Sequence, residues 1–97
     1  MKFGGTSLAD RPRIDTVVAL VRAHLADRPV VVCSAHAGVT DLLLEGARKA
    51  AAGEPDLEPI RAREHEVLRG LNLKTTLVDD ELDRLGQMFE GLSLLSL

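Results

Sequence analysis

Residues 30–44 read VVVCSAHAGVTDLLL, and this stretch decides the fold that we expect for the chain. Its first four residues, Val30 to Cys33, form an apolar and mostly β-branched run between turn residues. Such a run is typical of a strand that is buried on both faces of a parallel sheet. We therefore expect Cys33 to be a core residue rather than a reactive thiol.

A loop and a helix should follow this strand. Small residues together with Gly38 predict the loop, and Thr40 or Asp41 is placed to cap a helix that runs to about Ala51. The sequence Gly-Glu-Pro at residues 53–55 then breaks the helix.

The N-terminal residues predict a similar order of elements. Residues 2–4 are a strand candidate that ends in a Gly-Gly turn, and Ser7 or Asp10 can cap the helix that comes next. This helix should end near Asp27. Its apolar positions recur at three- and four-residue spacing and form one stripe that we expect to be buried: Ile14, Val17, Val18, Val21 and Leu25. Residues 1–53 thus predict a strand-helix-strand-helix core with a rudimentary parallel sheet.

Residues 54–97 predict a helical hairpin. Apolar positions at helical spacing run from Leu57 to Leu71 and again from Leu82 to Leu92, and the polar residues 72–76 join the two stretches. The sequence GLSLLSL at residues 91–97 is apolar and should pack against something else. The expected fold class is therefore α/β, with two strand candidates and three to four helices in a single domain.

Composition excludes several classes of protein. The chain has 97 residues, 45% of them hydrophobic, and a formal net charge of -3 with acidic and basic residues interleaved. It therefore offers no electrostatic footprint for nucleic acid or for an anionic membrane. One cysteine excludes an internal disulfide, and no apolar run is long enough to span a bilayer. Gly4, Gly5 and Asp10 stand where the apolar region of a signal peptide would be, so we expect a cytoplasmic protein.

The titratable residues do not predict a metal site. The histidines at positions 24, 36 and 65 are too scattered, and His65 stands between two glutamates as on a solvated helix face. The acidic residues between positions 79 and 83 are explained by the positive end of a helix dipole, where carboxylates are stabilising.

Two glycine-containing loops carry the candidate site. Each follows a strand and precedes a helix, which is where α/β folds bind ligands. Backbone N–H groups beside glycine can approach an anion closely, and a helix N-terminus adds about half a positive charge. The residues with this potential are Lys2, Gly4, Gly5, Thr6 and Ser7 in the first loop and Ser34, Gly38 and Thr40 in the second. On these residues alone, the loops are either a phosphate or small-anion site or only turns and helix caps.

Two motifs in register carry a resemblance to a known family. KFGGTSLAD at residues 2–10, followed by VVVCSAHAGVTDLLL at residues 30–44, closely resembles the N-terminal region of aspartokinases, which belong to the amino-acid kinase family. The resemblance covers essentially the whole chain, because aspartokinases also insert a helical hairpin after the second strand. It implies a partial amino-acid kinase-like fold, as a single truncated domain over residues 1–97.

The resemblance also implies a reaction and roles for the loop residues. Aspartokinases transfer the γ-phosphoryl group of ATP, with Mg, to the β-carboxylate of L-aspartate in amino-acid biosynthesis, including that of lysine. Lys2 resembles the lysine that contacts the transferring phosphate, which makes it the candidate catalytic residue. The implied contacts to the nucleotide come from Lys2, Gly4, Gly5 and Thr6, and those to the substrate from Ser7, Ser34 and Thr40. The protein contributes positioning and charge neutralisation, without a covalent intermediate.

The chain departs from the family pattern in what it lacks. Its 97 residues contain neither the Ser-x-Gly-Glu segment with the substrate-binding glutamate, nor the Arg-Gly-Gly-Ser-Asp-like segment, nor the adenine-binding region. We therefore expect the isolated chain to be inactive. Apolar edges that would face the rest of a kinase predict a homodimer or higher oligomer. The alternative is a non-catalytic binding or assembly module derived from the kinase fold.

Overall fold

The chain divides into two compact units in a computed structural model that describes residues 1–95. The first unit comprises Met1–Thr40 and the second begins at Asp41. Two residues of the predicted hairpin segment, Ser96 and Leu97, lie outside the described residues. None of the described helices is both long enough and apolar enough to cross a membrane.

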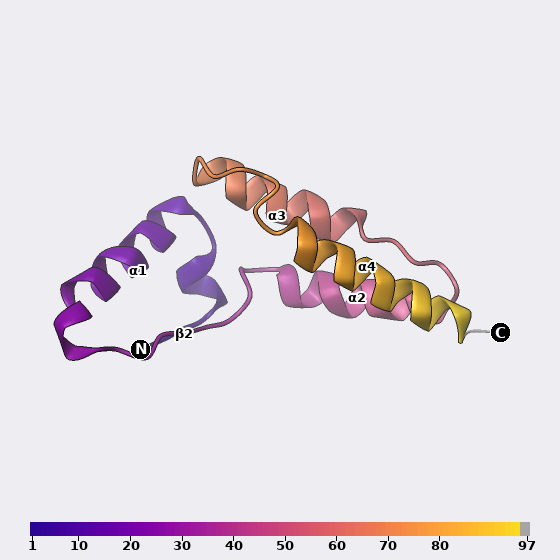
Figure 1. Ribbon diagram of the computed structural model, residues 1–97, viewed down its shortest axis with the longest axis horizontal. Coiled ribbons are helices and arrows are strands. Elements are labelled where there is room, and N and C mark those ends of the chain that lie inside the picture. Colours follow the sequence, from indigo (N-terminus) through magenta and orange to yellow (C-terminus); the bar gives the residue numbers. More distant parts are fainter. Residues whose placement is uncertain (96–97) are drawn as a thin grey trace. The chain divides into compact units, whose positions relative to one another are not determined.

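The first unit contains the sheet, which has two parallel strands within the described part of the chain. Its elements are β1 (Lys2–Phe3), the 3-10 helix η1 (Gly5–Leu8), α1 (Arg11–Ala23), the 3-10 helix η2 (Leu25–Asp27) and β2 (Val32–Cys33) (Figure 1). The strands pair in the register Lys2 with Val32 and Phe3 with Cys33. A backbone bond from the Ser34 N–H to the Phe3 carbonyl, 3.0 Å long, continues the pairing past the end of β2. The predicted strand-helix-strand order and the parallel sheet are confirmed.

Helix α1 begins as predicted but ends earlier. The Asp10 carboxylate accepts a hydrogen bond from the Arg13 backbone N–H at 3.1 Å, which makes Asp10 the N-cap, and a proline stands in the first turn. The predicted end near Asp27 is wrong, because the last α-helical residue is Ala23. After it the His24 N–H donates to the Val21 carbonyl in a tighter turn, and η2 carries the chain to Arg28, which has a left-handed φ of 50°.

The predicted burial of the second strand is wrong. Val30 is 76% exposed, Val32 is 54% exposed, and Cys33 is exposed rather than a core residue. A parallel strand is buried when helices cover both faces of its sheet and other strands flank it. Here the described sheet ends after two strands, so its β-branched residues remain in contact with solvent.

The predicted apolar stripe of α1 is buried only in part. Val17 is buried and Ile14 and Val21 are partly buried, whereas Val18 and Leu25 are exposed. The helix therefore covers less apolar surface than its periodicity predicts, because a two-stranded sheet presents too narrow a face for the whole stripe.

Helix α2 (Val39–Ala51) ends where the sequence predicts, but its start is not capped as expected. It begins at Val39, so Thr40 and Asp41 lie inside its first turn rather than at the N-cap. Gly38, just before the helix, has a φ of +83°, a left-handed conformation that a residue with a Cβ atom adopts only with strain.

The second unit is built from the remainder of α2 with α3 (Glu58–Gly70) and α4 (Asp79–Leu94), which lie alongside one another in Figure 1. The two predicted hairpin helices are confirmed, and acidic residues occupy the first turn of α4 as expected. Its buried core consists of Ala50, Ile60, Leu82 and Phe89. His65 departs from the expected solvated face: it is partly buried, and its Nε2 has no hydrogen-bond partner among the described residues.

A glycine determines how closely two helices of this core approach, and further apolar side chains surround the core. A Cβ atom on Gly46 of α2 would lie 2.8 Å from Cζ of Phe89, so α2 and α4 meet where glycine leaves room for the ring. Partly buried side chains pack around the buried residues, and they come from α2, from α4 and from the residues that precede α3 and α4: Leu42, Leu43, Ala47, Leu57, Val78 and Leu85. The three helices thus close a core of their own.

Candidate functional site

The two predicted loops lie against each other in the first unit. They follow β1 and β2, and because these strands are parallel neighbours, their carboxyl ends reach the same edge of the sheet. A Cβ atom built on Gly5 would lie 3.4 Å from the Ala35 carbonyl oxygen and 3.6 Å from the Ala37 Cα. The backbones of the two loops therefore approach closely enough that a single added methyl group on Gly5 would be in van der Waals contact with the second loop, as expected from the strand order.

His36 makes a second link between these loops. Its ring Nδ1 lies 3.2 Å from the Leu8 carbonyl oxygen, a separation suited to a hydrogen bond in which a proton on Nδ1 is donated. The ring is partly buried and Leu8 is buried, so the link is shielded from water. No role was predicted for His36 from the sequence, where its one distinctive feature is that it stands between Ala35 and Ala37.

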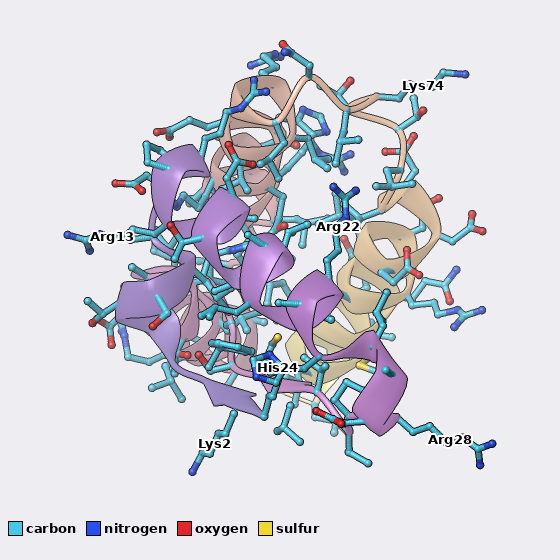
Figure 2. The ribbon with its side chains drawn as sticks, turned by 90° about the vertical axis from the view of Figure 1, so that its left-hand side faces the viewer. Lys2, Arg13, Arg22, His24, Arg28 and Lys74 are labelled. Carbon is cyan, nitrogen blue, oxygen red and sulfur yellow. The ribbon has the colours of Figure 1, made fainter. Side chains whose placement is uncertain are left out.

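The charged and hydroxyl residues nearest the sheet edge are open to solvent. Lys2 stands on β1 opposite Val32, and its exposed side chain extends away from α1 in Figure 2. Ser34 follows β2, and its hydroxyl donates to the Ala35 carbonyl at 3.0 Å. Thr40 is exposed in the first turn of α2. All seven predicted site residues belong to the first unit.

Thr6 and Ser7 lie on another side of the first loop. Both residues are in η1 and line a cavity of about 270 Å³ whose other walls come from Phe3 and from α1. The Arg13 guanidinium donates to the Thr6 carbonyl at 3.1 Å and ties α1 to η1 beside this cavity. The structure thus divides the predicted residues between the edge where the two loops meet and a cavity under α1.

The glycines of the first loop are not required by the fold itself. Gly4 has a φ of -88°, and a Cβ atom there would meet nothing within 4 Å. Gly5 is not among the glycines with positive φ, and its Cβ atom would make ordinary contacts. Gly38 and Gly46 differ, because backbone conformation requires glycine at the first and close packing requires it at the second. Neither backbone conformation nor packing therefore requires glycine at position 4 or 5.

The sheet edge carries charges of both signs. Lys2 brings an ammonium group and the start of α2 brings the positive end of a helix dipole, whereas the exposed Asp41 in the first turn of α2 brings a carboxylate. Within residues 1–95, no three His, Cys, Asp or Glu side chains group closely enough to hold a metal ion. The residues present could therefore contact phosphate oxygens, but they do not provide a metal centre of their own.

Comparison with curated proteins finds three aspartokinases of Arabidopsis thaliana among the relatives. Aspartokinase 2, chloroplastic, is 32% identical over 104 residues, which is 98% of this chain and 19% of the relative. Aspartokinase 3, chloroplastic, and aspartokinase 1, chloroplastic, are each 28% identical over 102 residues, again 98% of this chain and 18% of the relative. The chain thus spans about a fifth of the length of the curated relatives that it matches. No solved structure matches it significantly.

The family comparison covers nearly the whole chain. A model described as the amino acid kinase family matches residues 1–93, which include both strands, both loops and the start of every helix described above. The resemblance seen in residues 2–10 and 30–44 is therefore part of a match that continues through α3 and into α4. On this evidence, the chain belongs to the amino acid kinase family.

Proposed function

We propose that the chain is the N-terminal part of an aspartokinase, and that its two adjacent loops form the phosphate side of the site. The reaction is transfer of the γ-phosphoryl group of ATP to the β-carboxylate of L-aspartate. Similarity to three aspartokinases supports the substrate, and the family match supports the class of chemistry. The observation that carries the proposal is the contact between the loops at Gly5, Ala35 and Ala37.

In this proposal Lys2 and the first-loop glycines contact the nucleotide. The Lys2 ammonium neutralises charge on the transferring phosphoryl group, and the backbone N–H groups near Gly4 and Gly5 donate to phosphate oxygens. That the fold does not require glycine at either position supports this role, because a Cβ atom there would mainly obstruct a ligand. Thr6 belongs to the same proposed phosphate-binding set.

The proposed substrate contacts come from Ser7, Ser34 and Thr40. The hydroxyls of Ser34 and Thr40 are exposed, Ser34 directly after β2 and Thr40 at the start of α2. The Thr40 hydroxyl can donate to a carboxylate and hold it near the phosphate, whereas the Ser34 hydroxyl can do so only after it releases its hydrogen bond to the Ala35 carbonyl. Ser7 is assigned by resemblance, and its place under α1 makes it the weakest member of the set.

Magnesium would accompany the nucleotide rather than occupy a protein site. Mg²⁺ in phosphoryl transfer neutralises charge on the phosphate oxygens. The described residues offer no cluster of metal ligands, and the part that we propose for them is to bind and orient the phosphates that the ion accompanies. A carboxylate oxygen then attacks the γ-phosphorus in line with the leaving oxygen.

Calorimetric titration with Mg-ATP tests this assignment. We expect millimolar or tighter binding by the 97-residue chain, and its loss in Lys2→Ala because the ammonium is removed from the phosphates. Lys74→Ala is the matched control: it removes an exposed lysine from a turn of the second unit and should leave binding unchanged. Absence of heat, or equal loss in both variants, would contradict the proposal. No phosphorylation of aspartate is expected from the isolated chain, which spans only about a fifth of the relatives.

Exposed apolar surface favours a second candidate function, that of an assembly module. Exposed apolar side chains occur on the residues that lead into and form β2, and on α4 with the residue after it: Val30, Val31, Val32, Met88, Leu92, Leu94 and Leu95. Self-association would cover them. Light scattering at micromolar concentration should then give a mass above the 10.5 kDa of one chain, reduced by Val30→Lys with Val32→Lys. A monomer at that concentration rules this candidate out.

A further inference from the structure

We propose that the cavity between β1, η1 and α1 binds a small carboxylate with an apolar body. The cavity has a volume of about 270 Å³ and lies wholly within the first unit. Its cation is Arg13 on α1 rather than Lys2 on β1, although it shares Thr6 and Ser7 with the loop that we assign to nucleotide and substrate binding. Figure 2 shows that the side chains of Lys2 and Arg13 leave the ribbon in different directions.

The walls of the cavity are of two chemical kinds. Phe3, Val17 and Leu20 supply apolar surface, and the polar rim consists of Thr6, Ser7, Arg13 and Thr16. Val17 is buried and forms the inner wall, whereas Leu20 is 44% exposed and lies on the open side. An apolar wall with a few convergent polar groups is the usual make-up of a small-molecule site.

The Arg13 guanidinium favours an anionic ligand in this cavity. Its Nη1 donates to the Thr6 carbonyl, which holds the guanidinium at the rim and leaves its other N–H groups for a ligand. Other arginines of the chain are paired with carboxylates, such as Arg11 with Asp15 at 3.6 Å and Arg61 with Glu58 at 3.3 Å. No carboxylate within residues 1–95 makes a comparable pair with Arg13, so the guanidinium is available for an anionic ligand.

The hydroxyls select a carboxylate over a larger anion. Thr16 donates its hydroxyl hydrogen to the Pro12 carbonyl at 3.0 Å, so its oxygen can only accept from a ligand. Thr6 and Ser7 can donate, which gives the rim two hydroxyl donors beside one guanidinium. One cation and two hydroxyl donors suit the two oxygens of a single carboxylate, while the apolar wall suits a branched or aromatic body.

Titration of the isotopically labelled 97-residue chain with isovalerate, followed by amide NMR shifts, tests this proposal. We expect saturable shifts at Thr6, Ser7 and Thr16, and binding at least about fivefold tighter than that of the neutral isostere isovaleramide. Arg13→Gln should abolish the preference for the carboxylate. Arg11→Gln, which removes a neighbouring arginine outside the cavity, should preserve it.

A second pair of variants keeps the test independent of the Arg13 bond to η1. Leu20→Asp places a like charge in the cavity and should weaken isovalerate binding at least about fivefold. Val18→Asp is the control, since Val18 is also exposed on α1 but does not line the cavity. Circular dichroism should show that α1 persists in both. Equal affinity for isovalerate and isovaleramide, shifts centred elsewhere, or no saturation at tens of millimolar would each overturn the proposal.

Discussion

The two units of this chain bury their apolar residues to different extents. In the second unit, three helices enclose a core in which Ile60 and Phe89 are each 3% exposed. In the first unit, the residues at β2 are as apolar in sequence but remain open to water. Helices satisfy their backbone hydrogen bonds internally and need only a neighbouring helix, whereas a parallel strand needs partners on both edges and cover on both faces.

This difference matters for function because the candidate site lies in the less enclosed unit. All the predicted contact residues are in Met1–Thr40, on loops that are positioned by only two paired strands. The second unit holds its own core and carries none of them. The free energy of unfolding should therefore depend mainly on the helices of the second unit, and ligand binding mainly on the two loops of the first unit.

The largest expected effect is a core truncation in the second unit. Phe89→Ala removes a buried ring that packs beside Gly46 and Ile60, and should cost about 3–5 kcal/mol in the free energy of unfolding. Met88→Ala is the matched control, because Met88 is 66% exposed and should change stability by about 0.5 kcal/mol or less. Urea denaturation followed by circular dichroism measures both. Equal losses of unfolding free energy in Phe89→Ala and Met88→Ala would mean that the second unit has no specific core.

A smaller effect should come from adding a methyl group where two helices meet. Gly46→Ala would place a Cβ atom 2.8–2.9 Å from two atoms of the buried Phe89 ring and should cost about 1–3 kcal/mol. Gly86→Ala has only an ordinary contact, 3.5 Å to Leu57, and should gain roughly 0.5–1 kcal/mol from helix propensity. Thermal melts should move in opposite directions for the two variants. A shared direction would show that the approach of α2 and α4 is wrongly described.

The first unit should respond most clearly to loss of its helix cap. Asp10→Ala removes the acceptor for the Arg13 N–H and should destabilise α1 by about 1 kcal/mol. Asp15→Ala, which removes only an exposed ion pair with Arg11, should cost about 0.5 kcal/mol or less. Hydrogen exchange of α1 amides resolves this unit from the other. Protection that is unchanged in Asp10→Ala would contradict the cap.

The smallest effect concerns an exposed ion pair on α2. Hydrogen bonds from the Arg48 guanidinium, at 2.6 and 3.0 Å, hold the pKa of the Glu45 carboxyl below its ordinary value. Because the folded-state pKa is below the unfolded one, the pair stabilises the fold above the unfolded pKa and is lost as pH falls through the folded value. Glu45→Gln should therefore slightly flatten the fall of Tm as the pH is lowered into the acid range. Identical acid profiles for wild type and Glu45→Gln would refute the pairing.

Sequence reasoning succeeded where structure depends on neighbours along the chain. The helix over Glu58–Gly70 and the Asp10 cap follow from periodicity and from a short side chain at a helix start, and both are present. The exposure of Val30 and Cys33 could not be predicted in this way, because the burial of a strand depends on neighbouring strands and helices that are distant in sequence. An apolar, β-branched run such as residues 30–33 is compatible with a buried strand and with an exposed one.

The candidate site was predictable in outline but not in detail. Parallel pairing places both loops at one edge, and the close approach at Gly5 agrees with that geometry. The hydrogen bond between His36 and Leu8 and the cavity lined by Thr6 and Ser7 depend on how η1 turns, which no residue pattern in the first loop specifies. The roles of Lys2 and the hydroxyl residues remain predictions to be tested by binding.

The nuclear Overhauser effect between Gly5 and Ala37 tests the central claim most directly, since the whole site depends on contact between the two loops. We predict cross-peaks from the Gly5 Hα protons to the Ala37 backbone, together with slow exchange of the Ser34 amide that donates to Phe3. A Gly5 with no cross-peak to residues 35–37, in a chain whose α1 is fully formed, would contradict the account.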